Sequence, residues 1–480
     1  MTAREWLAIP MVLTLLGALL GAVWVYVRRF SPAPEGARKL FHVGSGLVAL
    51  TLPWLFHSAA PIAALCGLTL AIMLALKHVP AARRGPGQVL FRVHRDSYGE
   101  VYFPLGVGVL LLLCLKPAGR SAGYPLLYAI PILVLTLADT VAALIGAPYG
   151  RLHYSAAEGQ KSLEGSLAFA LVTFLSVHIP LLLFSPTGRV QSLLIAVIVG
   201  LLVMMAEAIA WRGLDNLVIP LATYFLLEAF LHLSAAALAG QLLIVAGLGA
   251  VALAWRRRTT LNDGALMGCI LAGYVILVLG GPLWLLAPLL LFVSYVPLTR
   301  PAPGDDPRSH NVRVVLSLAS AGLVWLLLAR ALHLPALFYP FTIVFAAHLA
   351  IIGLVRGREP ASRFQAPASR FPAPAGLFQA AAPDTSTPVF QAGTVPAVAI
   401  VKAWLLLLCV YLPTGESPSA FAVRGALGLA GIAAAALAFY ATQPGMRLGP
   451  PAPVRWNREA VCASAGSLAG LVPLLFLPHG

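Results

Sequence analysis

Residues 124–147 read YPLLYAIPILVLTLADTVAALIGA, a run long enough to cross a lipid bilayer as a helix and apolar except for one carboxylate, Asp139. Similar runs recur along the 480-residue chain, which is 60% hydrophobic and 10% charged, with a mean hydropathy of +0.88. Soluble domains are about one quarter charged, so this composition excludes a water-soluble protein. The pattern predicts an all-α fold, a polytopic transmembrane helical bundle embedded in the lipid bilayer.

Hydropathy along the chain predicts about sixteen membrane spans, and we expect the first to be retained because it is too long for a signal peptide's core. The spans cover roughly 6–27, 43–57, 59–76, 100–115, 124–147, 163–184, 191–210, 217–233, 235–254, 264–280, 282–297, 312–334, 338–355, 396–412, 420–441 and 460–478. Two composition shifts divide the chain: a basic linker at Trp255–Thr260 and a stretch rich in Pro, Ala, Ser and Gln. We therefore predict two membrane modules, 1–258 and 259–480, the second interrupted by a disordered cytosolic loop at about 357–395.

The formal net charge of +15 is explained by membrane topology. If the N-terminus lies outside, most of the 32 Lys and Arg residues fall in loops on the inside, as the positive-inside rule requires. We therefore expect a multi-pass protein of the cell (cytoplasmic) membrane. The charge does not indicate a nucleic-acid-binding protein.

Asp139 is the most informative residue, because an ionisable group at bilayer depth is costly unless it has a role and a partner. On a helix it shares one face with Ala142, Ala143, Gly146 and Gly150. Close packing between helices explains the small residues, but it does not explain the carboxylate. We therefore predict a functional role for Asp139.

The segment Lys161-Ser-Leu-Glu164-Gly-Ser166 begins the next predicted span. A helix that starts at the cytosolic face offers backbone N–H groups and its positive dipole end to phosphate. Lys161 adds a mobile positive charge suited to phosphate oxygens, and Glu164 is suited to bind a divalent cation or to orient an acceptor hydroxyl. Gly159-Gln-Lys-Ser162 is not a Walker motif, because its glycine precedes the lysine by two positions and no strand comes before it.

Three further polar groups lie at the same face under this topology, and each is weak alone. Juxtamembrane Arg and Lys residues usually only set topology, and an Arg-Gly-Asp-Asn turn can simply cap two helices. Together they combine carboxylates, basic groups and a helix N-terminus, which a magnesium nucleotide site needs. The groups are Arg38-Lys39-Leu-Phe-His42, Asp96-Ser-Tyr-Gly-Glu100, and Glu207 with Trp211-Arg-Gly-Leu-Asp-Asn216.

These segments resemble the membrane-embedded CTP-dependent polyprenol kinases, the family of phytol kinase and dolichol kinase, which is related to phosphatidate cytidylyltransferases. The similarity covers about residues 30–233 and implies phosphoryl transfer from a nucleotide, typically CTP, to the hydroxyl of an isoprenoid alcohol at the cytosolic face. The matching pieces are Arg38-Lys39-x-x-His42, Ser97-x-Gly99-Glu100 with Phe103-Pro104, Asp139-x-x-Ala142-x-x-x-Gly146-x-x-x-Gly150, Lys161-Ser162-x-Glu164-Gly165-Ser166 and Arg212-Gly213-x-Asp215-Asn216.

With this resemblance, we expect Asp139, Lys161 and Glu164 to be catalytic, and Asp139 and Asp215 to bind Mg²⁺. Glu100 and Glu207 would support the site or contact the acceptor, an alcohol such as phytol, geranylgeraniol or a polyprenol. The phosphoryl donor would be CTP or another nucleoside triphosphate. The expected nucleotide-binding residues are Arg38, Lys39, His42, Gly146, Gly150, Ser162, Gly165, Arg212, Asp215 and Asn216.

The second module resembles, more loosely, the membrane family that contains plant phytyl-phosphate kinases. That family carries an intramembrane aspartate where this chain, at Thr342–Leu354, has His348 and no carboxylate. We therefore expect the second module to be degenerate. The similar pieces are Leu261-Asn-Asp-Gly-Ala265 with Gly268, Gly280-Gly281 and Trp456-Asn-Arg-Glu-Ala-Val461.

Two alternative functions use similar residues. In a cytidylyltransferase that forms a CDP-lipid, a phosphorylated lipid would attack the α-phosphate of CTP and release pyrophosphate. An ion-coupled transporter would bind ions at its carboxylates, but such groups are expected near the bilayer midplane in repeated halves. Here they lie toward one face and in one half of the chain. The residues do not identify the alcohol, and they do not distinguish CTP from ATP.

Overall fold

The computed structural model describes residues 3–91, 97–115, 124–298, 310–357, 391–442 and 453–472. Over these ranges the chain is helical apart from one short β-hairpin and an isolated bridge. It divides into two compact units: the first is Met1–Ala254 with Asn262–Leu271, and the second is Trp255–Leu261 with Ala272–Gly480. The predicted module boundary after residue 258 falls within Trp255–Leu261.

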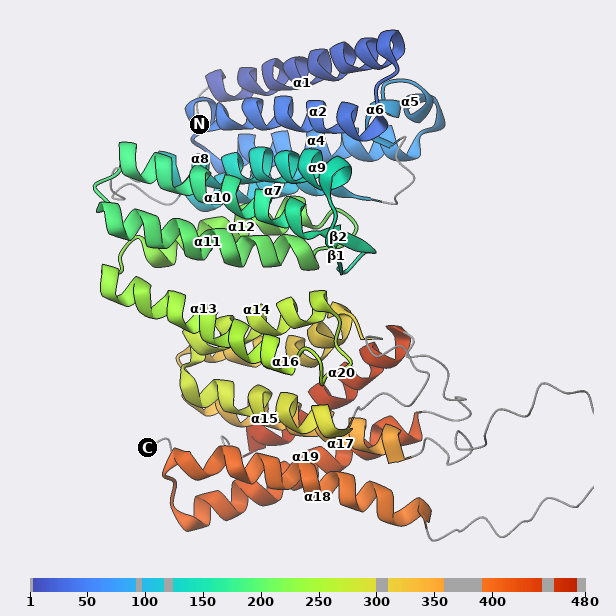
Figure 1. The fold of residues 1–480 in the computed structure, drawn as a ribbon, viewed down its shortest axis with the longest axis vertical. Coiled ribbons are helices and arrows are strands. Elements are labelled where there is room, and N and C mark those ends of the chain that lie inside the picture. Colours follow the sequence, from blue (N-terminus) through green and yellow to red (C-terminus); the bar gives the residue numbers. More distant parts are fainter. Residues whose placement is uncertain are drawn as a thin grey trace, which may run out of the picture. The chain divides into compact units, whose positions relative to one another are not determined.

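In the first unit, α1 packs against α2 and α4, α4 against α7, α7 against α8 and α12, and α10 against α9 and α11 (Figure 1). A hairpin of β1 and β2 joins α9 to α10. The elements are α1 (Ala3–Phe30), α2 (Pro34–Leu50), α3 (Leu52–Leu55), α4 (Ala59–His78), α5 (Pro80–Arg84), α6 (Gln88–Phe91), α7 (Gly99–Cys114), α8 (Tyr124–Leu133), the π-helix η1 (Val134–Ala138), α9 (Asp139–Tyr149), β1 (His153–Ser155), β2 (Gln160–Ser162), α10 (Leu163–Phe184), α11 (Arg189–Ile209), α12 (Asp215–Phe230) and α13 (Ala235–Trp255).

The core of the first unit forms where apolar faces of α1, α2, α4, α7 and α8 meet. Ile62, Leu110 and Leu111 are almost completely buried there. Tyr128 is also buried, and its hydroxyl donates to the backbone oxygen of Ala49 at 2.8 Å. This core joins α2 to α8 and thereby positions α2 beside the helix that carries Asp139.

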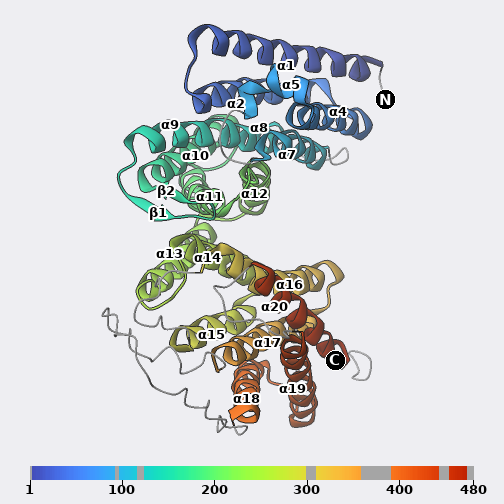
Figure 2. The ribbon, with the colours of Figure 1, turned by 90° about the vertical axis from the view of Figure 1, so that its right-hand side faces the viewer.

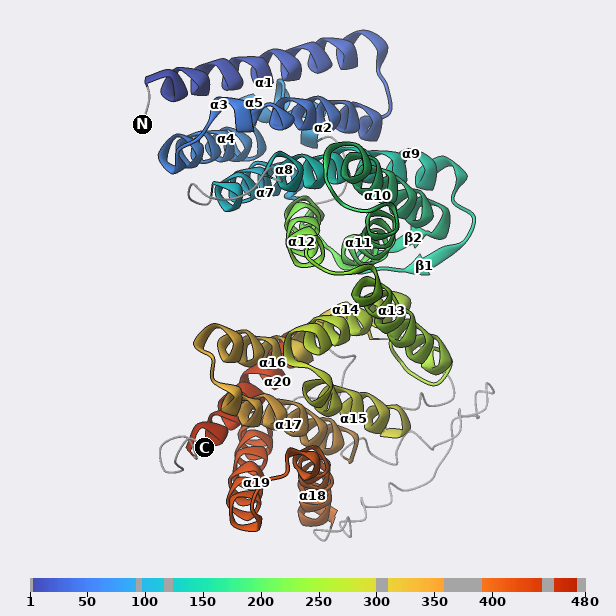
Figure 3. The same cartoon turned by 90° about the vertical axis from the view of Figure 1, so that its left-hand side faces the viewer.

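In the second unit, α17 is the most buried of the candidate spans, and it packs against α15, α16, α18, α19 and α20. Figures 2 and 3 show α18 and α19 beside each other and against α17. His348 lies on α17 and is fully buried. The elements are the later part of α14 (Asp263–Gly280), α15 (Pro282–Leu298), α16 (Val312–Leu332), η2 (Pro335–Leu337), α17 (Phe338–Gly357), α18 (Gln391–Tyr411), η4 (Leu412–Thr414), α19 (Pro418–Ala441), α20 (Pro453–Ser467) and η5 (Leu468–Leu471).

Within the described residues, 11 helices are long and apolar enough to cross a membrane, which confirms an all-α polytopic membrane fold but not sixteen spans. The predicted span 43–57 is divided between α2 and α3. α7 and α12 have only 16 residues each, fewer than the roughly 20 that a bilayer core requires. Of the predicted loop 357–395, residues 358–390 lie outside the described ranges, whereas its last five belong to α18.

Candidate active site

Helix α2 carries the first group of predicted site residues. It begins at Pro34, whose fixed φ and missing N–H suit a first helical turn. Arg38, Lys39 and His42 therefore lie inside a helix that starts nine residues before the predicted span, and not in the loop preceding it. His42 follows Lys39 by three residues and Arg38 by four, which places its side chain one turn further along the same helix.

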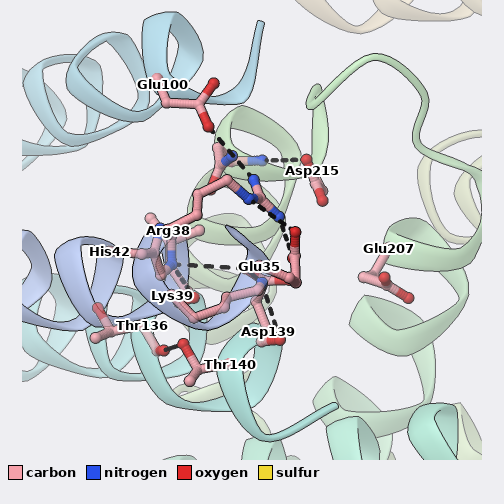
Figure 4. Close-up of polar contacts among 12 residues, drawn as sticks. Glu35, Arg38, Lys39, His42, Glu100, Thr136, Asp139, Thr140, Glu207 and Asp215 are labelled. Carbon is pink, nitrogen blue, oxygen red and sulfur yellow. Dashed lines mark hydrogen bonds and ion pairs between the residues drawn. The ribbon is translucent and has the colours of Figure 1, made fainter. Parts of the chain in front are cut away.

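Lys39 and His42 both approach Asp139 (Figure 4). The Nζ atom of Lys39 lies 2.5 Å from Oδ2 of Asp139 and donates to its backbone oxygen at 3.2 Å. The Nε2 atom of His42 lies 3.6 Å from the same carboxylate oxygen. Only 6% of the Lys39 side chain and 14% of the Asp139 side chain are exposed. This pairing explains how a carboxylate is tolerated here, since a buried charge needs a partner.

The π-helix η1 directly precedes Asp139 and supplies a backbone contact to α2. The oxygen of Leu135 lies 3.1 Å from Nε2 of His42, which donates to it in the corresponding tautomer. Short π-helical segments are frequent at functional sites because they disturb the regular pairing of carbonyls. Here the segment ties His42 to the helix that carries Asp139.

Gly46 allows α2 to approach η1 closely. A Cβ atom at this position would overlap the side chain of Thr136, which is β-branched and buried. We expect Gly46→Ala to lower the free energy of unfolding by about 1–3 kcal/mol and to reduce activity by displacing His42. Thermal unfolding of the detergent-solubilised protein measures the first effect.

The matched control for that variant is Gly67→Ala on α4, where an added Cβ would meet nothing within 4 Å. Alanine is the better helix former, so this control should be neutral or stabilising by up to about 1 kcal/mol. Equal thermal midpoints for the two variants would show that the contact between Gly46 and Thr136 does not limit the packing of α2.

Arg38 connects two carboxylates from different helices. Its guanidinium donates to Glu35 at 2.6 and 3.3 Å and to Oε1 of Glu100 on α7 at 3.4 Å. Burial alone would lower the pKa of Arg38, but the hydrogen bond and charge of Glu35, together with Glu100, outweigh it and raise that pKa. Arg38 is therefore a permanent positive charge beside Asp139.

The second polar group is centred on Lys161 in the hairpin. Lys161 pairs in register with Tyr154, and its Nζ atom lies 2.5 Å from Oε1 of Glu207 on α11. Burial would lower the pKa of Lys161, but the carboxylates of Glu207 and then Asp215 outweigh it and raise that pKa. Figure 4 shows Glu207 and Asp215 on the side of the site away from α2.

The predicted Arg212-Gly213-x-Asp215-Asn216 segment meets the start of α7. The backbone oxygen of Arg212 accepts from Tyr98 N at 2.9 Å. Gly213 has a φ of +82°, and a Cβ atom there would overlap the backbone of Gly99. This contact requires glycine for both its conformation and its size. Two segments more than a hundred residues apart are thus joined at the site.

The sequence is 31% identical over 218 residues to a phytol kinase of Synechocystis sp. (strain ATCC 27184 / PCC 6803 / Kazusa), covering 45% of this chain and 89% of that protein. The chain belongs to the phytol kinase family of polyprenol kinase-like membrane proteins. No family model matches the chain, and no solved structure matches it.

Some residues of this chain that were predicted to be functional have structural roles. Ser162 caps α10 by accepting from Gly165 N at 3.2 Å. Added Cβ atoms at Gly146 and Gly150 would crowd the Ser162 side chain, so these glycines allow α9 to pack against the start of α10. Their predicted contacts with nucleotide remain a prediction, because packing alone accounts for glycine at these positions.

Glu164 joins neither polar group. Both of its carboxylate oxygens accept from the backbone N–H of Leu152, at 3.1 and 3.3 Å. These hydrogen bonds connect the residue that precedes the hairpin to the first turn of α10. Glu207, which was expected to support the site or contact the acceptor, is the carboxylate that contacts Lys161.

Several contacts were not predicted from the sequence. Glu35 could have been found from its i,i+3 spacing to Arg38. Gly46 belongs to a Gly-Ser-Gly run that small-residue packing rules could have identified. Lys77 stacks over the ring of Tyr98 and donates to the backbone oxygen of Ser97 at 2.7 Å; no local pattern indicates this long-range contact. Asp96 lies outside the described residues.

The predicted magnesium site can be compared with the carboxylates that the structure describes. In the part of the chain that the structure describes, no group of three His, Cys, Asp or Glu side chains is arranged to hold a metal by itself. Mg²⁺ commonly takes only one or two protein carboxylates and completes its coordination with phosphates and water. Asp139 and Asp215 remain the predicted carboxylate ligands.

Proposed function

We propose that this protein transfers the γ-phosphoryl group of CTP to the hydroxyl of an isoprenoid alcohol. Phytol is the first candidate acceptor, because the related protein is named a phytol kinase. The observation that carries the proposal is the pairing of the buried Asp139 with Lys39 and His42, in the same close-up as Glu207 and Asp215 (Figure 4). Acidic and basic groups gathered at one end of several helices suit the binding of a triphosphate.

Lys161 and the N-terminal turn of α10 would bind the phosphates. Lys161 is already charged and held by Glu207 and lies directly before Ser162, the cap of that helix. The helix dipole and a lysine both favour anionic oxygens. Arg38 and Lys39 would add positive charge from α2. Asp139 and Asp215 would hold Mg²⁺, which when bound would neutralise charge on the phosphates.

In the transfer step, the oxygen of the alcohol forms a bond to the γ-phosphorus while the bond between that phosphorus and CDP breaks. The hydroxyl proton passes to a carboxylate of the site, and CDP leaves. Such chemistry depends mainly on positioning and charge stabilisation. We further propose that the reaction takes place at the cytosolic face of the cell membrane, which the distribution of Lys and Arg residues supports.

An assay of the purified protein in detergent tests this proposal. The protein is given CTP or ATP together with phytol, geranylgeraniol, a polyprenol or dioleoylglycerol. We expect an isoprenyl monophosphate with CTP, loss of that product on chelation of divalent ions, and its return when Mg²⁺ is added. No phosphorylated isoprenoid with either nucleotide, in a protein that remains folded and monodisperse, would overturn the proposal.

A further inference from the structure

A cavity in the first unit connects the polar group on α2 with the apolar interior. It is bounded mainly by α1, α2, α4 and α7. Arg38, His42, Glu100 and Asn216 line one part of it, whereas Val12, Leu52, Ile62, Leu65 and Leu111 are among the apolar residues that line the rest. A cavity that is polar in one region and apolar elsewhere suits an amphiphile with one small head group.

The residues that line the cavity follow one face of α2 and one face of α7. On α7 it includes Glu100, Phe103, Val107 and Leu111, spaced three or four residues apart. Glu100 and Leu111 are three turns apart, about 16 Å at the rise of an α-helix. That length is about half of the roughly 30 Å hydrocarbon core of a bilayer, and it suits one extended hydrocarbon chain.

Two buried acceptor atoms of the polar region have no hydrogen-bond partner among the described residues, although Arg38 donates to the other carboxylate oxygen of Glu100. Among the described residues, Oε2 of Glu100 and Oδ1 of Asn216 are buried without a hydrogen-bond partner, and only 8% of the Glu100 side chain is exposed. An unsatisfied buried acceptor is costly, so this region favours a ligand that donates an O–H.

The cavity also reaches the proposed site of phosphoryl transfer. His42 lines the cavity and lies 3.6 Å from Oδ2 of Asp139. An alcohol whose hydroxyl lies between His42 and Glu100 would therefore be beside Asp139. Its tail would extend along α2 and α7 toward Leu111.

We propose that this cavity is the acceptor site and that it holds a single-chain isoprenoid alcohol, an inference that rests on the proposed kinase function. Glu100 accepts the hydrogen bond of the hydroxyl. It receives the proton as the alcohol oxygen bonds to the γ-phosphorus and CDP departs. The far end of the cavity, at Leu111, limits the length of tail that binds.

Adjacent leucines on α7 provide a matched test. Leu111 lines the cavity and is 1% exposed, whereas Leu112 is 37% exposed and does not line it. We expect Leu111→Phe to lower kcat/KM for geranylgeraniol by about tenfold or more. The same variant should leave kcat/KM for geraniol, which is half as long, nearly unchanged, as should Leu112→Phe for both alcohols.

The outcomes separate the two proposals. If the wild-type protein phosphorylates no isoprenoid alcohol, the kinase function is wrong. If it does so but both Phe variants lose activity equally with both alcohols, or neither variant loses any, the cavity is not the acceptor site. Efficient phosphorylation of dioleoylglycerol by the wild-type protein would overturn the single-chain assignment.

A binding measurement on the wild-type protein avoids any folding defect in the variants. Geranylgeraniol with a photoreactive diazirine at the end of its tail is added without nucleotide, and labelled residues are found by mass spectrometry. We expect labelling near Ile62 and Leu111, reduced by excess unlabelled geranylgeraniol. Labelling confined to lipid-facing side chains such as Leu112 would overturn the assignment.

Discussion

Asp139→Asn should reduce phosphoryl transfer by at least about a hundredfold to a thousandfold, the range seen when one preorganised electrostatic group is removed from an active site. Asparagine has nearly the same shape, but it removes the negative charge that faces Lys39 and His42. It also removes a proposed Mg²⁺ ligand. The measurement is kcat with CTP and the preferred alcohol, at saturating concentrations of both.

The neighbouring residue supplies the control for that variant. Thr140 is buried and donates only to the backbone oxygen of Thr136 among the described contacts, at 2.7 Å. Thr140→Val should therefore retain most of the activity. Both variants should elute as folded protein from size-exclusion chromatography in detergent. Wild-type kcat for Asp139→Asn would exclude Asp139 from the chemistry.

Lys161→Gln should lower kcat/KM for CTP by about a hundredfold, mainly by raising the KM for CTP. The lysine contributes a positive charge that the proposed site places against the phosphates. However, its removal also leaves Glu207 buried without its partner, which can destabilise a protein by about 3–5 kcal/mol. A loss of activity in this single variant therefore does not separate catalysis from folding.

A double variant, Lys161→Gln with Glu207→Gln, separates the two effects. It removes the uncompensated charge, so its thermal midpoint should return toward that of the wild type. Its kcat/KM for CTP should stay low, because the proposed phosphate contact is still missing. Recovery of activity together with stability would show that the pair between Lys161 and Glu207 is purely structural.

The prediction from sequence succeeded where a residue is energetically unfavourable in its local sequence. Asp139 was identified because a carboxylate inside an apolar run requires a partner. Lys39, from another helix, is that partner. The segments around Arg38, Glu100, Asp139 and Asp215 were expected at one face, and the structure brings them into one neighbourhood (Figure 4).

The prediction was less successful where tertiary packing determines the helix boundaries and the side-chain contacts. Helix α2 starts at Pro34 because that residue suits a first turn, although the hydropathy rises only later. The π-helix before Asp139 leaves no trace in hydropathy, and neither does the overlap that requires glycine at position 46. Sequence spacing gave no indication that the hairpin directs the side chain of Lys161 to Glu207, 46 residues away.

The central claim is that the γ-phosphate of a nucleotide is transferred to a lipid alcohol, and CTP with a radiolabel in either the α- or the γ-phosphate tests it most directly. The purified protein is incubated with each labelled CTP and an equal mixture of geranylgeraniol and geranylgeranyl phosphate, and the lipid is extracted. We expect label in the lipid from γ-labelled CTP and none from α-labelled CTP. Label in the lipid from α-labelled CTP alone would contradict the account and indicate cytidylyl transfer.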